Sequence, residues 1–142
     1  MDVLKAENNI DVVVALETLE HIPEGDVVRL VEKISRLKPL LFCCSVPVEV
    51  GPSIWCKNLG SFLMGYRRTK YTLSQTIWAG LYKLDKLPRH GSTHRGFNWL
   101  WLAQTIRYNF RIEKIKTLPF GFIPAWLAPT VFFVAKPWVD KQ

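Results

Sequence analysis

Alternating apolar and polar runs divide the chain into short elements. Residues 10–16 (IDVVVAL) and 40–46 (LLFCCSV) are apolar runs, typical of strands buried on both faces. Between Pro23 and Pro39, apolar residues recur at helical spacing, with acidic residues at the start and basic residues at the end. A strand, a helix and a strand joined by short connections predict a βαβ unit with parallel strands.

The remainder of the chain first interrupts and then resumes this alternation of strands and helices. Residues 48–97 are expected to form a helical insertion or lid, with a helix over 72–84. Asn98 is placed to cap a further helix, and residues 110–118 and 129–137 have the pattern of strands. The predicted order of β, α, β, insertion, α, β, β indicates the later half of a doubly wound α/β domain.

Composition supports one globular domain. The chain has 142 residues, of which 49% are apolar and 22% charged. This is enough for a hydrophobic core and is unlike the composition of a disordered chain.

No apolar run reaches the roughly 18 residues that span a membrane, and the start lacks a signal-peptide pattern, so we expect a cytoplasmic protein. Cys43, Cys44 and Cys56 are too few and wrongly spaced for a disulfide framework or a zinc site.

The formal net charge of +7 favours an anionic partner such as nucleic acid, a phospholipid surface or a phosphorylated substrate, although a solvated surface explains charge equally well. Aromatic and basic residues interleave within 55–83. Such a mixture can stack nucleic-acid bases or seat a helix at a lipid surface. More often it forms a helical cap packed on the core.

An acidic cluster follows the first predicted strand. Glu17, Glu20 and His21 have the spacing i, i+3, i+4 that places side chains on one face of a helical turn. Two carboxylates and an imidazole suit a divalent ion such as magnesium, manganese or iron. Without a metal, the glutamates would brace the loop, and His21 would line an acceptor pocket or act as a base. In both interpretations the cluster lies at the carboxyl end of a strand, where α/β folds bind ligands.

Four segments together resemble a known family: DVVVALETLEHIP (11–23), LLFCCSVPVE (40–49), HRGFNW (94–99) and PTVFFVAKP (129–137). They are similar to the C-terminal half of class I S-adenosylmethionine-dependent methyltransferases. The resemblance implies a Rossmann-like α/β fold in which the chain forms strands four to seven in the spatial order 4-5-7-6. The last strand would be antiparallel, and the helical insertion would follow strand five. Residues 1–142 would then form one partial domain.

The resemblance also implies a reaction and a cofactor site. The protein would transfer a methyl group from S-adenosylmethionine to an unidentified small-molecule, lipid or RNA acceptor. Asp2 would accept a hydrogen bond from the adenine amino group, and the Val3 backbone N–H would meet the ring. Ala15 and Leu16 would pack against the cofactor, and His21 is the candidate catalytic residue. The alternatives are a frayed terminus for Asp2 and ordinary core positions for Ala15 and Leu16.

Two branches of the family use a metal. Plant-type small-RNA 2′-O-methyltransferases and ubiquinone-pathway O-methyltransferases carry E-x-x-E-H as magnesium ligands. By resemblance, Glu17, Glu20 and His21 would bind Mg²⁺ here, and His94 in HRGFNW would be the fourth ligand. The metal would hold the substrate hydroxyls and lower the pKa of the attacking oxygen, which is metal-assisted O-methylation.

The sequence lacks the glycine-rich cofactor loop that the family places after strand one, so we expect an N-terminally truncated fragment of a methyltransferase. Strand 12–16 would then be an edge that is covered, paired with a partner chain or a second copy, or exposed. Two alternatives to an enzyme stay open. One is a non-catalytic half-domain that needs a partner chain, and the other is a basic module that binds nucleic acid or a membrane surface.

Overall fold

The computed structural model describes residues 10–65, 72–87 and 97–138. The elements in chain order are β1 (Val12–Leu16), η1 (Leu19–His21), α1 (Glu24–Arg36), β2 (Leu41–Pro47), α2 (Ser53–Leu63), α3 (Leu73–Gly80), η2 (Leu84–Lys86), α4 (Trp99–Asn109), β3 (Phe110–Leu118) and β4 (Thr130–Pro137). Helices and strands follow one another in the order that the hydrophobic pattern predicts. The predicted cap is confirmed, because the Asn98 side chain accepts a hydrogen bond from the Leu100 backbone N–H at 3.0 Å.

The four strands form one mixed sheet in the order β1-β2-β4-β3. β1 and β2 are parallel, with Val14 opposite Cys43. β4 runs antiparallel to both β2 and β3. A helix between two parallel strands and an antiparallel last strand are compatible with a partial methyltransferase fold.

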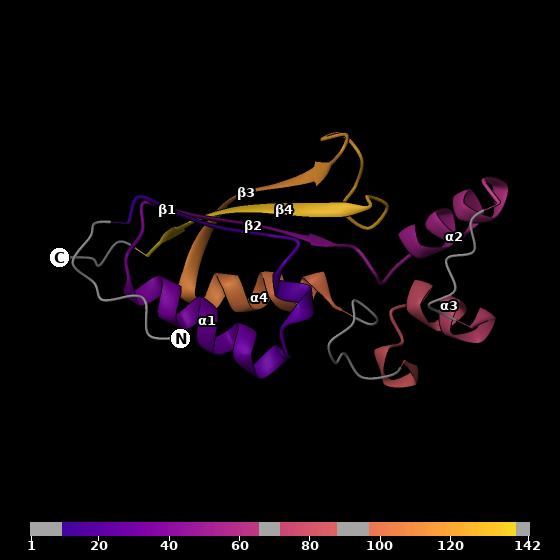
Figure 1. The fold of residues 1–142 in the computed structure, drawn as a ribbon, viewed down its shortest axis with the longest axis horizontal. Helices are drawn as coiled ribbons and strands as arrows, with labels where there is room; N and C mark the ends of the chain where they lie inside the picture. The colour runs from indigo at the N-terminus through magenta and orange to yellow at the C-terminus, as the bar shows by residue number, and fades with distance from the viewer. Residues whose placement is uncertain (1–9, 66–71, 88–96, 139–142) are drawn as a thin grey trace.

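Two helices cover one face of this sheet. α1 and α4 lie on the same side of it (Figure 1). The apolar stripe of α1 and the matching stripe of α4 interlock with inward-facing strand residues such as Phe42 and Phe133. The fully or almost fully buried residues of the two helices are Val27, Val31, Ile34, Leu102, Ala103 and Ile106. This two-layer arrangement contains the core.

The other face of the sheet is largely open at β1. Val13 and Ala15 pack against the core, whereas Val12, Val14 and Leu16 alternate with them and are 47%, 56% and 53% exposed. The expectation that this strand is buried on both faces is therefore wrong for the chain as described. The reason is that both α1 and α4 cover the same face, as Figure 1 shows.

β1 is also an edge of the sheet. The expectation of an edge strand is confirmed, because within the described residues β1 pairs only with β2. An apolar strand with one unpaired side and one open face is a template for another strand or chain. Whether a partner covers it stays a prediction.

α2 and α3 form a helical pair that lies beyond the end of β2, away from the sheet (Figure 1). Trp55 Nε1 donates to the Thr76 carbonyl oxygen at 3.1 Å, and Asn58 Nδ2 donates to Thr76 Oγ1 at 3.1 Å. Gly80 faces the Trp55 indole so closely that a Cβ there would overlap the ring. The role of residues 48–97 as an insertion or lid stays a prediction.

The expected packing of the aromatic residues on the core is seen in part. Trp78 and Tyr82 pack against the core cluster, whereas Phe62 on α2 is exposed. Lys83 and Lys86 lie over the Trp78 ring, with Nζ 5.0 Å and 5.2 Å from its centroid. None of the helices described here is both long enough and apolar enough to cross a membrane.

Candidate functional site

The carboxyl end of β1 is tied to β2 by Glu17. Its backbone N–H donates to the Ser45 carbonyl oxygen at 3.0 Å, and Ser45 Oγ donates to Glu17 Oε1 at 3.1 Å. Glu17 adopts a positive φ of 45°, which turns the chain sharply out of the strand. A non-glycine residue in this conformation carries local strain, and such strain often marks a functional turn. Ser45 is a site residue that the sequence analysis did not identify.

The turn continues into the short helix η1, in which the neighbouring residues Glu20 and His21 differ in their exposure to solvent. Leu19 and Glu20 are fully buried, whereas the His21 side chain is 49% exposed. His21 Nε2 lies 3.9 Å from Glu20 Oε1. The structure therefore keeps Glu17, Glu20 and His21 in one short segment, but it directs the Glu20 carboxyl group inward and leaves the His21 imidazole accessible.

The environment of Glu20 disfavours its charged form. Burial is the largest cause and raises the pKa of this carboxyl group, and its own backbone N–H opposes the shift. The carboxylates of Glu17 and Glu49 raise the pKa further, while His21 lowers it. Three glutamates from the segments after β1 and β2 thus interact electrostatically at one end of the sheet.

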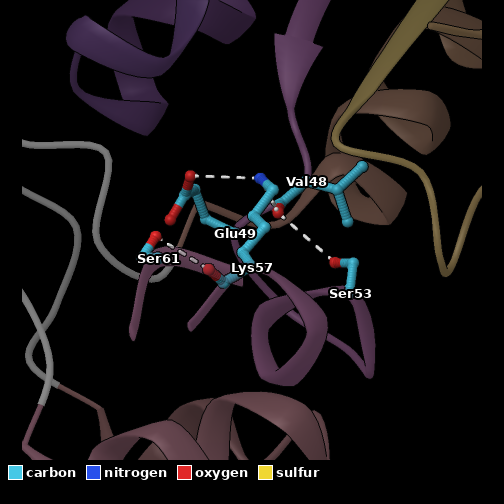
Figure 2. Close-up of polar contacts among 5 residues, drawn as sticks. All are labelled: Val48, Glu49, Ser53, Lys57 and Ser61. Atoms are coloured by element: carbon cyan, nitrogen blue, oxygen red, sulfur yellow. Dashed lines mark hydrogen bonds and ion pairs between the residues drawn. The ribbon is translucent and has the colours of Figure 1, made fainter. Parts of the chain in front are cut away.

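Glu49 belongs to a second polar cluster that the sequence analysis missed (Figure 2). Lys57 Nζ on α2 lies 3.4 Å from Glu49 Oε1 and donates to the Val48 carbonyl oxygen at 2.7 Å. Both charged side chains are only 13% exposed, so solvent screens this pair less than a surface pair. The contacts attach α2 to the end of β2. An acidic residue just after a strand parallel to β1 is the signal that could have found Glu49.

The metal prediction is tested only in part by this geometry. Within the described residues, no group of three or more His, Cys, Asp or Glu side chains is arranged to hold a metal ion. His94, the fourth expected ligand, lies outside the described residues. The described side chains alone therefore do not fit a magnesium site, and the set Glu17, Glu20, His21 and His94 stays a prediction.

The cofactor residues fall into two groups. Asp2 and Val3 lie outside the described residues. Ala15 is half-buried and packs against the core, which agrees with the alternative of a core position. Leu16 is exposed at the strand end beside Glu17, where it can meet a ligand. Of the expected contacts, Leu16 is the best placed.

Comparison with known proteins identifies the fold. No protein-family model and no curated protein matches this chain. Among solved structures, the chain is similar to the crystal structure of small RNA methyltransferase HEN1, with a TM-score of 0.53 and 14% sequence identity. The match covers 95% of this chain and 15% of the HEN1 chain, so this chain spans a small part of that protein's length. The chain therefore has a methyltransferase-like fold.

Proposed function

We propose that this chain is part of an S-adenosylmethionine-dependent methyltransferase domain whose reaction site lies at the carboxyl end of β1. The observation that carries the proposal is the likeness to a methyltransferase fold over 95% of the chain. The position of the Glu17–His21 turn supports it, because α/β folds bind ligands at the carboxyl ends of parallel strands.

In this proposal each residue of the turn has a separate task. The cofactor would supply an activated methyl group on its sulfonium. Leu16 and Ala15 would contact the cofactor, while Asp2 and Val3 would meet its adenine. His21, whose side chain is half-exposed, would accept the proton that the methyl acceptor loses. Glu17, held by Ser45, would fix the turn that carries His21.

The methyl acceptor in this proposal is a small molecule, a lipid or RNA. The name of HEN1 says that this neighbour methylates small RNA, which makes RNA one acceptor to test here. Magnesium enters the proposal as a test condition only, because the described residues alone do not make a site for it.

The test is a calorimetric titration of the chain with S-adenosylmethionine, first with magnesium and then with a chelator. The proposal expects saturable binding, and weaker binding by Leu16→Asp. Val12→Asp is a matched control, because Val12 lies on the same face at the other end of β1. Loss of binding in chelator would favour the ligand set with His94. A folded chain that binds no cofactor under either condition would contradict the proposal for this chain.

The exposed edge and face of β1 favour a second candidate. The chain would be a half-domain that becomes complete only when strands and helices of a partner chain, or a second copy, cover β1. Val12, Val14 and Leu16 support this, because apolar side chains on a parallel strand are normally covered on both faces. Light scattering coupled to size-exclusion chromatography distinguishes the candidates. A stable monomer that binds the cofactor alone would rule out the half-domain.

A further inference from the structure

The edge of the sheet opposite β1 is strongly basic. The described segment 97–138 contains five basic residues and one acidic residue, Glu113. The basic residues are Arg107 in the last turn of α4, Arg111, Lys114 and Lys116 on β3, and Lys136 on β4. Glu113 is paired with Arg111 at 2.6 Å, whereas within the described residues no carboxylate pairs with the other four. This edge therefore carries positive charge that no described residue compensates.

A β-bulge turns the basic side chains of β3 to one face of the sheet. Glu113 has no residue opposite it on β4, because the register of the two strands shifts there. Arg111, Lys114 and Lys116 lie opposite β4 residues that alternate with its fully buried ones, so they point away from the core. Without the extra residue, strand alternation would separate Lys114 and Lys116 from Arg111. The bulge thus gathers three cations on the face that α1 and α4 leave open (Figure 1).

A pocket of about 410 Å³ lies beside the first half of β3, and we call it the β3 pocket. Its lining includes Arg107, Arg111, Lys114 and Trp138. Trp138 directly follows β4 and is 56% exposed, so part of its indole ring is accessible to a ligand. The volume is within the range of about 300–1,000 Å³ that is usual for sites of small organic groups. An accessible tryptophan among cations can stack on a base while the cations bind phosphate.

The arrangement favours single-stranded nucleic acid over other anions. The cations continue beyond the β3 pocket, because Lys116 follows Arg111 by roughly 15 Å along the strand. A chain of phosphates can follow such a row, whereas one phosphate cannot. The Trp138 ring adds a stacking surface that an unpaired base can use and that an inorganic polyanion cannot. A duplex keeps its bases stacked on one another and would use only the charges.

We infer that the β3 pocket and the open face of β3 form a binding site for single-stranded nucleic acid. Trp138 stacks on one base in the pocket, and Arg107 and Lys114 bind the phosphates beside it. Lys116 and Lys136 meet further phosphates along the sheet. The site lies on the edge opposite β1, so the inference does not depend on cofactor binding or catalysis at the Glu17–His21 turn.

The test is fluorescence anisotropy of a labelled oligouridylate of about ten nucleotides, titrated with the full chain at several salt concentrations. The charge variant is Arg107→Gln combined with Lys114→Gln. Its matched control is Arg29→Gln combined with Lys33→Gln, which removes the same two charges from exposed positions on α1. Circular dichroism melts check that both variants fold.

A second pair of variants tests stacking. Trp138→Ala removes the ring, whereas Trp138→Phe keeps an aromatic face at the same position. Unlabelled inorganic polyphosphate of equal charge is the competitor that lacks bases, and unlabelled oligouridylate is its reference.

We expect saturable binding that salt weakens. The slope of log affinity against log salt should become shallower by about 1.4 in the charge variant, since each lost phosphate contact accounts for roughly 0.7, and should stay unchanged in the α1 control. Trp138→Ala should weaken binding about tenfold and Trp138→Phe much less, while polyphosphate should compete poorly.

Three results would overturn the inference. The first is a folded chain that does not bind the oligouridylate. The second is an equal loss of affinity in the charge variant and the α1 control. The third is polyphosphate that competes as well as unlabelled oligouridylate together with unchanged binding by Trp138→Ala, because the interaction would then depend on charge alone.

Discussion

The Ser45 hydroxyl donates a hydrogen bond to the Glu17 carboxylate at 3.1 Å, which joins the carboxyl ends of β1 and β2. A second hydrogen bond joins the same two residues, because the Glu17 backbone N–H donates to the Ser45 carbonyl oxygen. The two strands thereby present Glu17 and the following turn at the end of the sheet. The position of His21 depends on this turn, so Ser45 acts on the proposed site through Glu17.

Ser45→Ala removes both side-chain contacts with Glu17. We expect the free energy of unfolding to fall by about 1 kcal/mol, because the partner oxygen can still turn to water. Urea denaturation measures this change. Ser61→Ala is the control, since Ser61 donates to the Lys57 carbonyl oxygen within α2, and alanine is the better helix former. Equal losses in the two variants would contradict the role given to Ser45.

Two helical glycines allow a paired test of the α2–α3 contact. In Gly80→Ala the new Cβ would overlap the Trp55 indole, and we expect a loss of roughly 1–3 kcal/mol in unfolding free energy. At Gly60 a Cβ meets nothing within 4 Å, so Gly60→Ala should raise stability by about 0.5–1 kcal/mol. Thermal melts of both variants measure the difference. Stabilisation by Gly80→Ala would show that Trp55 does not lie against Gly80.

The cysteines should differ sharply in reactivity. Burial raises the pKa of the Cys44 thiol from 9.0 to about 12, and the neighbouring Cys43 adds to the shift. At pH 8 only about one Cys44 in ten thousand would then be thiolate, whereas Cys56 is exposed on α2. Mass spectrometry after iodoacetamide treatment should find Cys56 alkylated and Cys44 intact until the chain unfolds. Rapid labelling of Cys44 in the folded chain would contradict its burial.

The same shift has a consequence for stability at high pH. The folded state holds the Cys44 proton more tightly than the unfolded state does, so the contribution of Cys44 to stability is constant below pH 9 and is lost as the pH rises from 9 towards 12. Cys44→Ala should show a weaker fall over this window in denaturant titrations. A decline of the same steepness in both proteins would assign the effect to other groups.

The open face of β1 predicts association. Val14→Lys places a charge on a side chain that is 56% exposed, so the fold should tolerate it. Light scattering at increasing concentration should show less self-association than in the wild type. Val13→Lys is the contrasting variant, because Val13 packs against the core, and it should destabilise the fold. Unchanged association of Val14→Lys would indicate that β1 is not the contact surface.

Local signals in the sequence predict most of the fold. Pro23, Pro39 and Asn98 mark helix ends, and the two hydrophobic periods distinguish the strands from the helices. The open face of β1 could not be predicted in this way. An apolar run such as 12–16 looks the same whether one or two layers of helices cover it, and only the placement of α1 and α4 decides this.

In the candidate site, too, local features could be predicted from the sequence and tertiary contacts could not. Glu17, Glu20 and His21 are close in sequence, so their shared turn follows from spacing alone. The inward direction of Glu20 depends on how η1 packs, and the pairing of Glu49 with Lys57 depends on where α2 meets β2. Contacts between segments distant in sequence leave no periodic signal, which is why the Ser45–Glu17 and Glu49–Lys57 contacts were missed.

The measurement that tests the central claim most directly is a two-dimensional ¹H–¹⁵N NMR titration of the labelled chain with S-adenosylmethionine. We predict saturable shifts of the amide signals of Leu16, Glu17 and His21, with smaller shifts at Ser45 across the strand. The amides of Arg111–Ile115 on β3, at the far edge of the sheet, should stay unchanged. A well-dispersed spectrum that the cofactor leaves unaltered, or shifts confined to β3, would contradict the placement of a methyltransferase site at the end of β1.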